Sequence, residues 1–102
     1  MRKLKQWGKN KNFPDKVETW NIGEDVPEWL SDRANIVGFS KTGSLLLNMW
    51  QDDRGRYHIM DTAKPHIELL IIPSKDHTVL YGSGKLFVLG PKEIDFLYVE
   101  EE

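Results

Sequence analysis

Three histidines change charge near neutral pH, which makes them the first candidates for acid–base chemistry. His58, His66 and His77 are separated by eight and eleven residues, a spacing that matches no metal-binding motif such as H-E-x-x-H. We therefore expect ordinary half-exposed histidines on strands, with no shared metal site. Asp52 and Asp53 are adjacent carboxylates in a predicted turn, where aspartate bonds to nearby backbone, so we expect no catalytic acid–base pair.

A glycine-rich segment at residues 81–85, Y-G-S-G-K, has part of the composition of a phosphate-binding loop. The full pattern requires Ser or Thr after the lysine, and Leu86 stands there instead. Between two apolar segments, the same residues predict a hairpin turn. The chain has no cysteine, which excludes thiolate nucleophiles and disulfides. We expect no catalytic residue, no metal and no cofactor, and hence a protein that is not an enzyme.

The strongest candidates for ligand or partner binding gather at a predicted hairpin tip. Trp50, Arg54, Arg56 and Tyr57 lie close together in the sequence. Guanidinium groups beside an aromatic ring can hold a phosphate, a nucleobase or an acidic protein surface, and Trp and Arg are enriched in interface hot spots. We add His77 to this candidate site. The alternative is that Trp50 belongs to the core and the arginines only solvate the turn.

The charge distribution gives a second candidate site. The net charge is −2, but residues 1–16 carry six basic side chains and one acidic one, whereas the remaining residues carry eight basic and 15 acidic ones. A basic arm can contact phosphate while an acidic body repels it, and aromatic rings in the arm can stack on bases. A solvated, partly disordered tail, or an arm lying across a second copy, explains the same pattern. The candidate nucleic-acid residues are Arg2, Lys3, Lys5, Trp7, Lys9 and Lys11.

Apolar runs in the sequence are short. The longest, at residues 69–72, has four residues, whereas a membrane span needs about 20. The basic start is not followed by an apolar block, so we expect no secretory signal. The lack of cysteine fits a reducing compartment, and we expect a cytoplasmic protein with no membrane partner.

Alternating and helical patterns predict the elements. The acidic turn before Pro27 has a capping-box spacing and predicts a short helix over residues 26–34, and the sequence at 90–93 predicts the start of a second. Strands are expected over residues 17–22, 36–40, 45–51, 56–61, 66–72, 77–81 and 85–89.

These elements predict an α+β fold with a mainly antiparallel sheet of about six short strands and two short helices. We expect a basic N-terminal arm over residues 1–16 and a single domain over 17–102. Both helices are too short to cover a long sheet, so either the sheet curls into a partial barrel or a second copy covers it. Apolar side chains on both faces of the strand at 69–72 favour burial on both sides and make a homodimer one solution.

Two segments resemble a known group of small phage proteins. Residues 17–30, V-E-T-W-N-I-G-E-D-V-P-E-W-L, are similar to their opening strand, and residues 76–98, D-H-T-V-L-Y-G-S-G-K-L-F-V-L-G-P-K-E-I-D-F-L-Y, are similar to their closing hairpin and Pro-capped helix. These are the PGDYG-domain-like phage and prophage proteins, most of them without an assigned function. At the motif itself this chain has Lys75-Asp76-His77 and shares only the aspartate. The resemblance implies a phage or prophage origin and a similar architecture.

The sequence supports two function hypotheses. The first is a non-catalytic phage or prophage binding protein that inhibits a host defence system, either by docking on a host protein or by sequestering a small nucleotide. The alternative is a nucleic-acid-binding protein that uses the basic arm. A structural component of the virion is a third possibility that the residues leave open.

Overall fold

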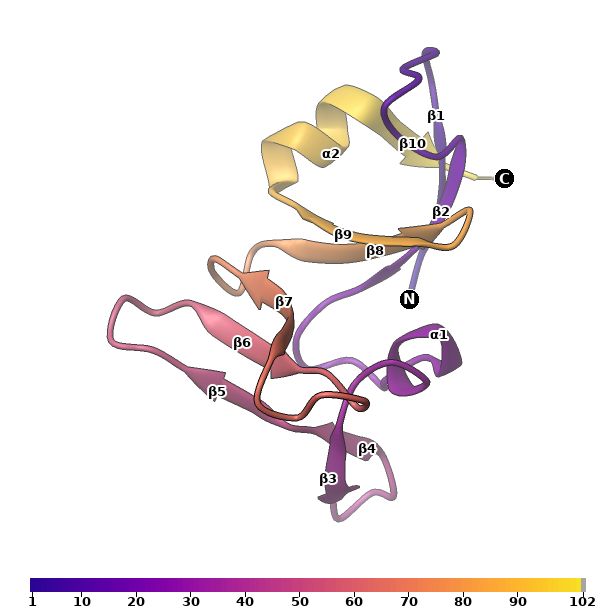
Figure 1. Ribbon diagram of the computed structural model, residues 1–102. Helices are drawn as coiled ribbons and strands as arrows, with labels where there is room; N and C mark the ends of the chain where they lie inside the picture. Colours follow the sequence, from indigo (N-terminus) through magenta and orange to yellow (C-terminus); the bar gives the residue numbers. More distant parts are fainter. Residues whose placement is uncertain (102) are drawn as a thin grey trace. The chain divides into compact units, whose positions relative to one another are not determined.

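The computed structural model describes residues 1–101, which form two compact units (Figure 1). Unit 1 comprises residues 1–22 and 75–101, and unit 2 is Gly23–Ser74. Each unit consists mainly of antiparallel strands and contains one short helix. No helix within residues 1–101 has the length and apolar character needed to cross a membrane.

Unit 1 is built on a five-stranded antiparallel sheet with the order β10-β1-β2-β8-β9. β8 and β9 form a tight hairpin in which Ser83 and Gly84 both have positive φ, the conformation that type I′ hairpin turns require. Helix α2 connects β9 to β10 and lies against the sheet in Figure 1. The elements are β1 (Lys3–Gln6), β2 (Lys16–Trp20), β8 (Thr78–Gly82), β9 (Lys85–Leu89), α2 (Pro91–Leu97) and β10 (Tyr98–Glu100).

The core of unit 1 joins the two ends of the chain. α2 begins at Pro91, whose missing N–H costs nothing in a first turn, and Glu93 accepts a hydrogen bond from the Gly90 backbone N–H at 3.0 Å. Each fully buried aliphatic side chain contributes roughly 1.5–3 kcal/mol relative to exposure. Leu4 is the side chain through which β1 contributes to this core. The buried cluster is Leu4, Val17, Leu80, Leu89, Ile94 and Tyr98.

Unit 2 contains two small sheets and a helix of one turn. β3 pairs with β4, while β5, β6 and β7 form a separate sheet in that order. Leu30, Ala34, Ile59 and Ile72 are buried apolar residues of this unit. Its elements are α1 (Glu28–Ser31), β3 (Ile36–Phe39), β4 (Leu45–Leu47), β5 (Met49–Gln51), β6 (Tyr57–Met60) and β7 (Glu68–Ile72).

The mainly antiparallel sheet with two short helices is confirmed, but the described residues form ten strands rather than about six. β1 and β10 are additional strands near the chain ends. The segment at 45–51 divides at Asn48, whose N–H bonds to the Asn35 carbonyl and whose carbonyl accepts from the Met60 N–H. The expected single strand therefore serves two sheets, both of which are open at their edges.

Helix α1 is shorter than the predicted helix over residues 26–34. It begins after Pro27, and the Asp25 carboxylate does not cap it but accepts a hydrogen bond from the Ser44 hydroxyl at 2.6 Å. The helix starts later than predicted because Pro27 disfavours helical backbone at the preceding residue, Val26.

The basic N-terminal residues take part in the sheet of unit 1. In β1, Leu4 pairs with Val17 on one side and with Glu100 on the other. Residues 3–6 therefore belong to the sheet and are not part of a solvated, partly disordered tail. The division into an arm over 1–16 and a domain over 17–102 stays a prediction.

The apolar strand at 69–72 is only partly covered in the described chain. Ile72 is fully buried, whereas Ile71 is 40% exposed. The homodimer suggested by this strand stays a prediction.

Candidate nucleic-acid interface

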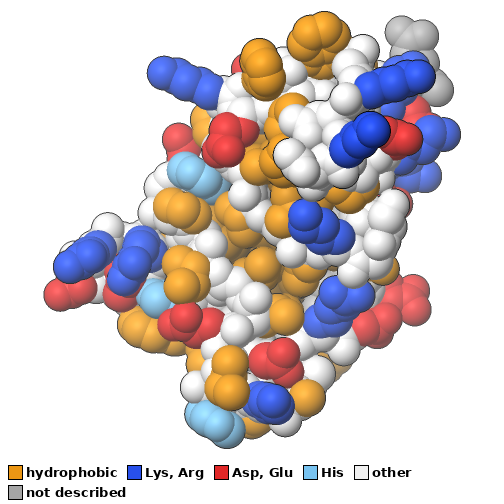
Figure 2. Space-filling view, turned by 45° about the horizontal axis from the view of Figure 1, so that its top comes forward, with side chains coloured by type: hydrophobic (Ala, Val, Ile, Leu, Met, Phe, Trp, Pro, Cys, Tyr) orange, Lys and Arg blue, Asp and Glu red, His pale blue; other side chains and the backbone are white. Residues whose placement is uncertain are grey.

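Basic side chains concentrate in unit 1. Residues 1–22 and 75–101 contain nine basic and seven acidic residues, whereas residues 23–74 contain five basic and eight acidic ones. In Figure 2 the blue side chains gather mainly at the upper right, where β1 and the segment after it lie in Figure 1. Unit 1 is thus the better candidate for a contact with an anion.

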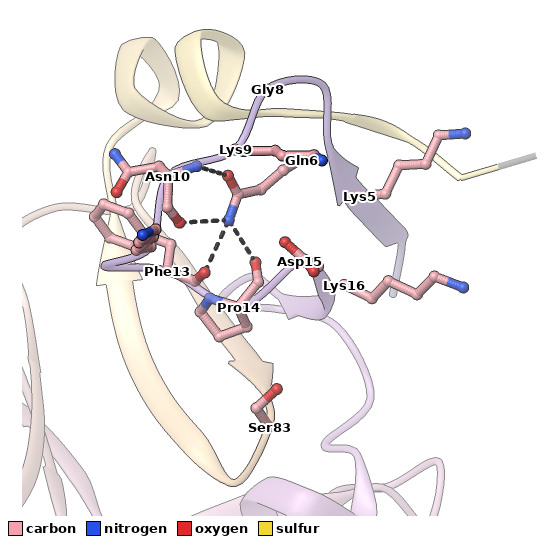
Figure 3. Close-up of a pocket in the computed structure, with 11 residues that line it drawn as sticks. Lys5, Gln6, Gly8, Lys9, Asn10, Phe13, Pro14, Asp15, Lys16 and Ser83 are labelled. Carbon is pink, nitrogen blue, oxygen red and sulfur yellow. Dashed lines mark hydrogen bonds between the residues drawn. The ribbon is translucent and has the colours of Figure 1, made fainter.

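A groove of about 760 Å³ lies beside the segment that joins β1 to β2 (Figure 3). Four exposed lysines line it, together with one carboxylate, that of Asp15. Exposed ammonium groups act as point charges that contact phosphate oxygens without demanding one geometry. The groove lysines are Lys5, Lys9, Lys11 and Lys16.

The side chain of Gln6 holds the segment over residues 7–15 in place. Its amide nitrogen lies 2.8 Å from the Phe13 carbonyl oxygen and 3.1 Å from those of Asn10 and Pro14, and its amide oxygen accepts from the Asn10 N–H at 2.8 Å. Figure 3 shows these bonds converging on the centre of the loop. Lys9 and Lys11 are therefore carried on an ordered loop.

Two further contacts fasten the loop to the body of unit 1. The buried hydroxyl of Tyr98 donates to the Pro14 carbonyl oxygen at 2.8 Å. Burial, together with the negative charge of Asp15, raises the pKa of Tyr98 above its ordinary value, so the hydroxyl keeps its proton. The Phe13 ring packs against that of Phe87, with centroids 5.7 Å apart.

Lys5 and Lys16 stand directly opposite each other in the β1–β2 register. Like charges at such positions repel and destabilise a sheet. Lys16 is partly compensated, because its Nζ lies 3.5 Å from Oε1 of Glu101. A phosphate near the pair would relieve the repulsion, which makes this position the most distinctive feature of the groove.

The residues predicted for nucleic-acid binding divide into two groups. Lys5, Lys9 and Lys11 line the groove, and Trp7 is an exposed residue of the same loop. Arg2 pairs with Glu100 at 3.3 Å, and Lys3 stands opposite Glu18. Neither of these two residues lines the groove. Sequence reasoning missed Lys16, which belongs to the groove because β1 pairs with β2.

A second cluster surrounds His58 in unit 2. Its imidazole stacks on the Trp50 indole, with centroids 4.1 Å apart and an interplanar angle of 8°. Nε2 lies 2.8 Å from Oδ2 of Asp52, and Nδ1 lies 2.5 Å from Oε1 of Glu68. The expectation of a half-exposed His58 is wrong, because the residue is 4% exposed.

The charge state of this cluster follows from its hydrogen bonds. The bond to Asp52 raises the pKa of His58 above its ordinary value, and Glu68 adds to this rise while burial opposes it. The same bond, with N–H donors of Arg56 and Arg54, holds the pKa of Asp52 far below its ordinary value. With both ring nitrogens donating to carboxylates, His58 joins β6 to its neighbours and has no nitrogen free to take a proton from a substrate.

The predicted ligand site around the hairpin is partly assembled. Arg56 binds Asp52 through Nε at 2.8 Å, and the Arg54 N–H binds the same carboxylate. Trp50 is 49% exposed and pairs with His58 across the strands, so it is not a core residue. Tyr57 occupies the next position along β6 and points to the opposite face.

His77 belongs to unit 1, whereas the hairpin belongs to unit 2. Its Nδ1 lies 2.9 Å from the Asp76 carboxylate.

Sequence reasoning did not predict the partners of His58, although the position of the turn could have indicated two of them. A hairpin centred on residues 53–55 places residue 50 opposite residue 58 and residue 52 beside residue 56.

No family model matches the chain, and the searches found no similar curated protein and no similar solved structure. Among residues 1–101, no group of three or more His, Asp or Glu side chains is placed to hold a metal ion. The chemistry of the groove and of the His58 cluster is therefore the basis for inferring function.

Proposed function

We propose that this protein is a non-catalytic nucleic-acid-binding protein that holds phosphate groups in the basic groove of unit 1. The observation that carries the proposal is the pairing of Lys5 with Lys16 beside an ordered loop that bears Lys9 and Lys11. Because the loop is already fastened by Gln6 and other contacts, little ordering entropy is lost when a ligand binds.

A polymer suits the groove better than a single nucleotide. All four lysines are exposed, and exposed lysines contribute through the number of phosphates they neutralise. A mononucleotide site needs polar groups that fix the base in an enclosed pocket. The arrangement therefore favours successive phosphates of a strand over one sequestered nucleotide.

The test is a titration of a fluorescein-labelled 15-nucleotide DNA followed by fluorescence anisotropy. The double variant Lys9→Gln/Lys11→Gln removes two exposed groove charges without touching the core. We expect affinity at 50 mM salt to fall about tenfold or more. Removing residues 1–11 instead would delete β1 and its buried Leu4, so it would confound binding with folding.

The matched control is Lys41→Gln/Lys64→Gln, which removes the same charge from two exposed positions of unit 2. We expect this control to bind like the wild type. Equal losses in the two double variants would show that only net charge matters, and the groove proposal would be rejected.

A second candidate function is docking on a partner protein, which in a phage-encoded protein would be a component of a host defence system. The observation that favours it is the half-exposed Trp50, which lies flat against His58, with the exposed Arg54 in the turn of the same hairpin. Trp and Arg on a rigid base are typical of interface hot spots. A partner retained by the wild type and by the groove variant, but lost by Trp50→Ala, would support this function.

A further inference from the structure

We infer that the bound nucleic acid is single-stranded, with its bases stacked on Trp7 and Phe96 at the rim of the basic groove. This inference rests on the proposed function and names the form of the ligand. Trp7 is 64% exposed and Phe96 is 71% exposed. Exposed aromatic rings beside a positively charged path are the two components of sequence-tolerant single-strand sites.

Trp7 is hydrogen-bonded to the backbone of α2 beside Phe96. The Trp7 indole N–H donates to the Phe96 carbonyl oxygen, and the Trp7 backbone N–H bonds to the Leu97 carbonyl oxygen at 3.4 Å. These bonds satisfy the polar edge of the indole and leave most of the side chain in solvent. A ring held in this way loses little freedom when a base stacks on it.

Trp7 and Phe96 form an aromatic platform that is continuous with the groove. Trp7, Phe96 and Leu97 line a second cavity of about 340 Å³. The loop at 8–11 and Gln6 line both this cavity and the lysine groove. Lys9 and Lys11 therefore border both spaces, with phosphate-binding charge on one side and flat apolar surface on the other.

The remaining aromatic residue of the loop, Phe13, does not extend the platform. Its ring packs against Phe87, and the ammonium group of Lys85 lies 5.9 Å from its centroid.

A duplex keeps its base faces inside the helix, whereas a single strand presents them to aromatic side chains. The platform thus selects single strands.

The experiment compares three 15-mers by fluorescence anisotropy: oligo-dT, an abasic deoxyribose-phosphate strand of equal charge, and a duplex of the same length. One stacked base contributes about 5- to 150-fold in affinity. We expect oligo-dT to bind at least about fivefold more tightly than the abasic strand. Trp7→Ala should lower oligo-dT affinity at least about fivefold and leave abasic binding unchanged, because one of the two stacking rings is lost. Trp7→Phe should restore most of the loss.

The control variant is Phe39→Ala, which removes an exposed aromatic ring from unit 2 and should leave all three affinities unchanged. Oligo-rU should bind within a few fold of oligo-dT, because phosphates and base faces are common to both. Equal binding of oligo-dT and the abasic strand, or tighter binding of the duplex, would overturn the stacking inference. If that binding still weakened in Lys9→Gln/Lys11→Gln, the proposed function would stand. Failure of every oligomer to bind would overturn both.

Discussion

Replacing Lys9 and Lys11 with glutamine should change how binding depends on salt as well as how tight it is. Each phosphate neutralised on a single strand contributes about 0.7 to the slope of log affinity against log salt concentration. Four groove lysines therefore give a slope of about −2.8 for the wild type and about −1.4 for the double variant.

These slopes translate into a large difference over an ordinary salt range. Between about 50 and 200 mM salt, wild-type affinity should fall about 50-fold and that of the double variant about 7-fold. Anisotropy titrations of the labelled 15-mer at five salt concentrations measure both slopes. The control Lys41→Gln/Lys64→Gln should keep the wild-type slope. Identical slopes in the wild type and the groove variant would refute the assignment of these lysines to phosphate contacts.

Three further predictions concern the residues that support the groove and the His58 cluster. Tyr98→Phe should lower the free energy of unfolding by about 1 kcal/mol and weaken oligonucleotide binding severalfold, since it releases the Pro14 carbonyl; denaturation and binding curves equal to wild type would contradict this. Gly82→Ala should destabilise the protein by about 1–3 kcal/mol in thermal melts, because its methyl group would overlap backbone of β2, whereas Gly8→Ala, which enters open space, should change little; equal effects would contradict the packing account. The pKa of His58 is raised in the folded protein, so its contribution to stability is complete below its ordinary pKa of 6.5 and is lost as pH rises through the folded-state pKa. His58→Gln should therefore reduce the fall of the urea unfolding midpoint with rising pH above pH 6.5. A pH profile equal to that of the wild type would count against the two hydrogen bonds between His58 and the carboxylates.

The fold was predictable where local patterns decide it. The hairpin predicted across residues 82–84 is present with its turn at residues 83–84, and the helix start at Pro91 was located correctly; both follow from turn and capping chemistry. β1 was not predicted, because it has one buried apolar residue, Leu4, between exposed lysines. Its strand conformation depends on pairing with β2 and with β10 from the other end of the chain, which no local pattern contains.

The candidate site, like the fold, was predictable from the sequence only in part. Charge alone identified Lys5, Lys9 and Lys11, but their meeting with Lys16 depends on strand register. The contact of His58 with Glu68 lies next to a register shift between β6 and β7, and such irregularities are set by tertiary packing.

The most direct test of nucleic-acid binding in the groove is a two-dimensional ¹H–¹⁵N NMR titration of the full chain with unlabelled oligo-dT. The account predicts that the largest shift changes fall on the amides of residues 5–16 and 96–97, with those of residues 50–58 nearly unmoved. Changes confined to residues 50–58, with the groove amides unmoved, would contradict it and place the binding surface at Trp50.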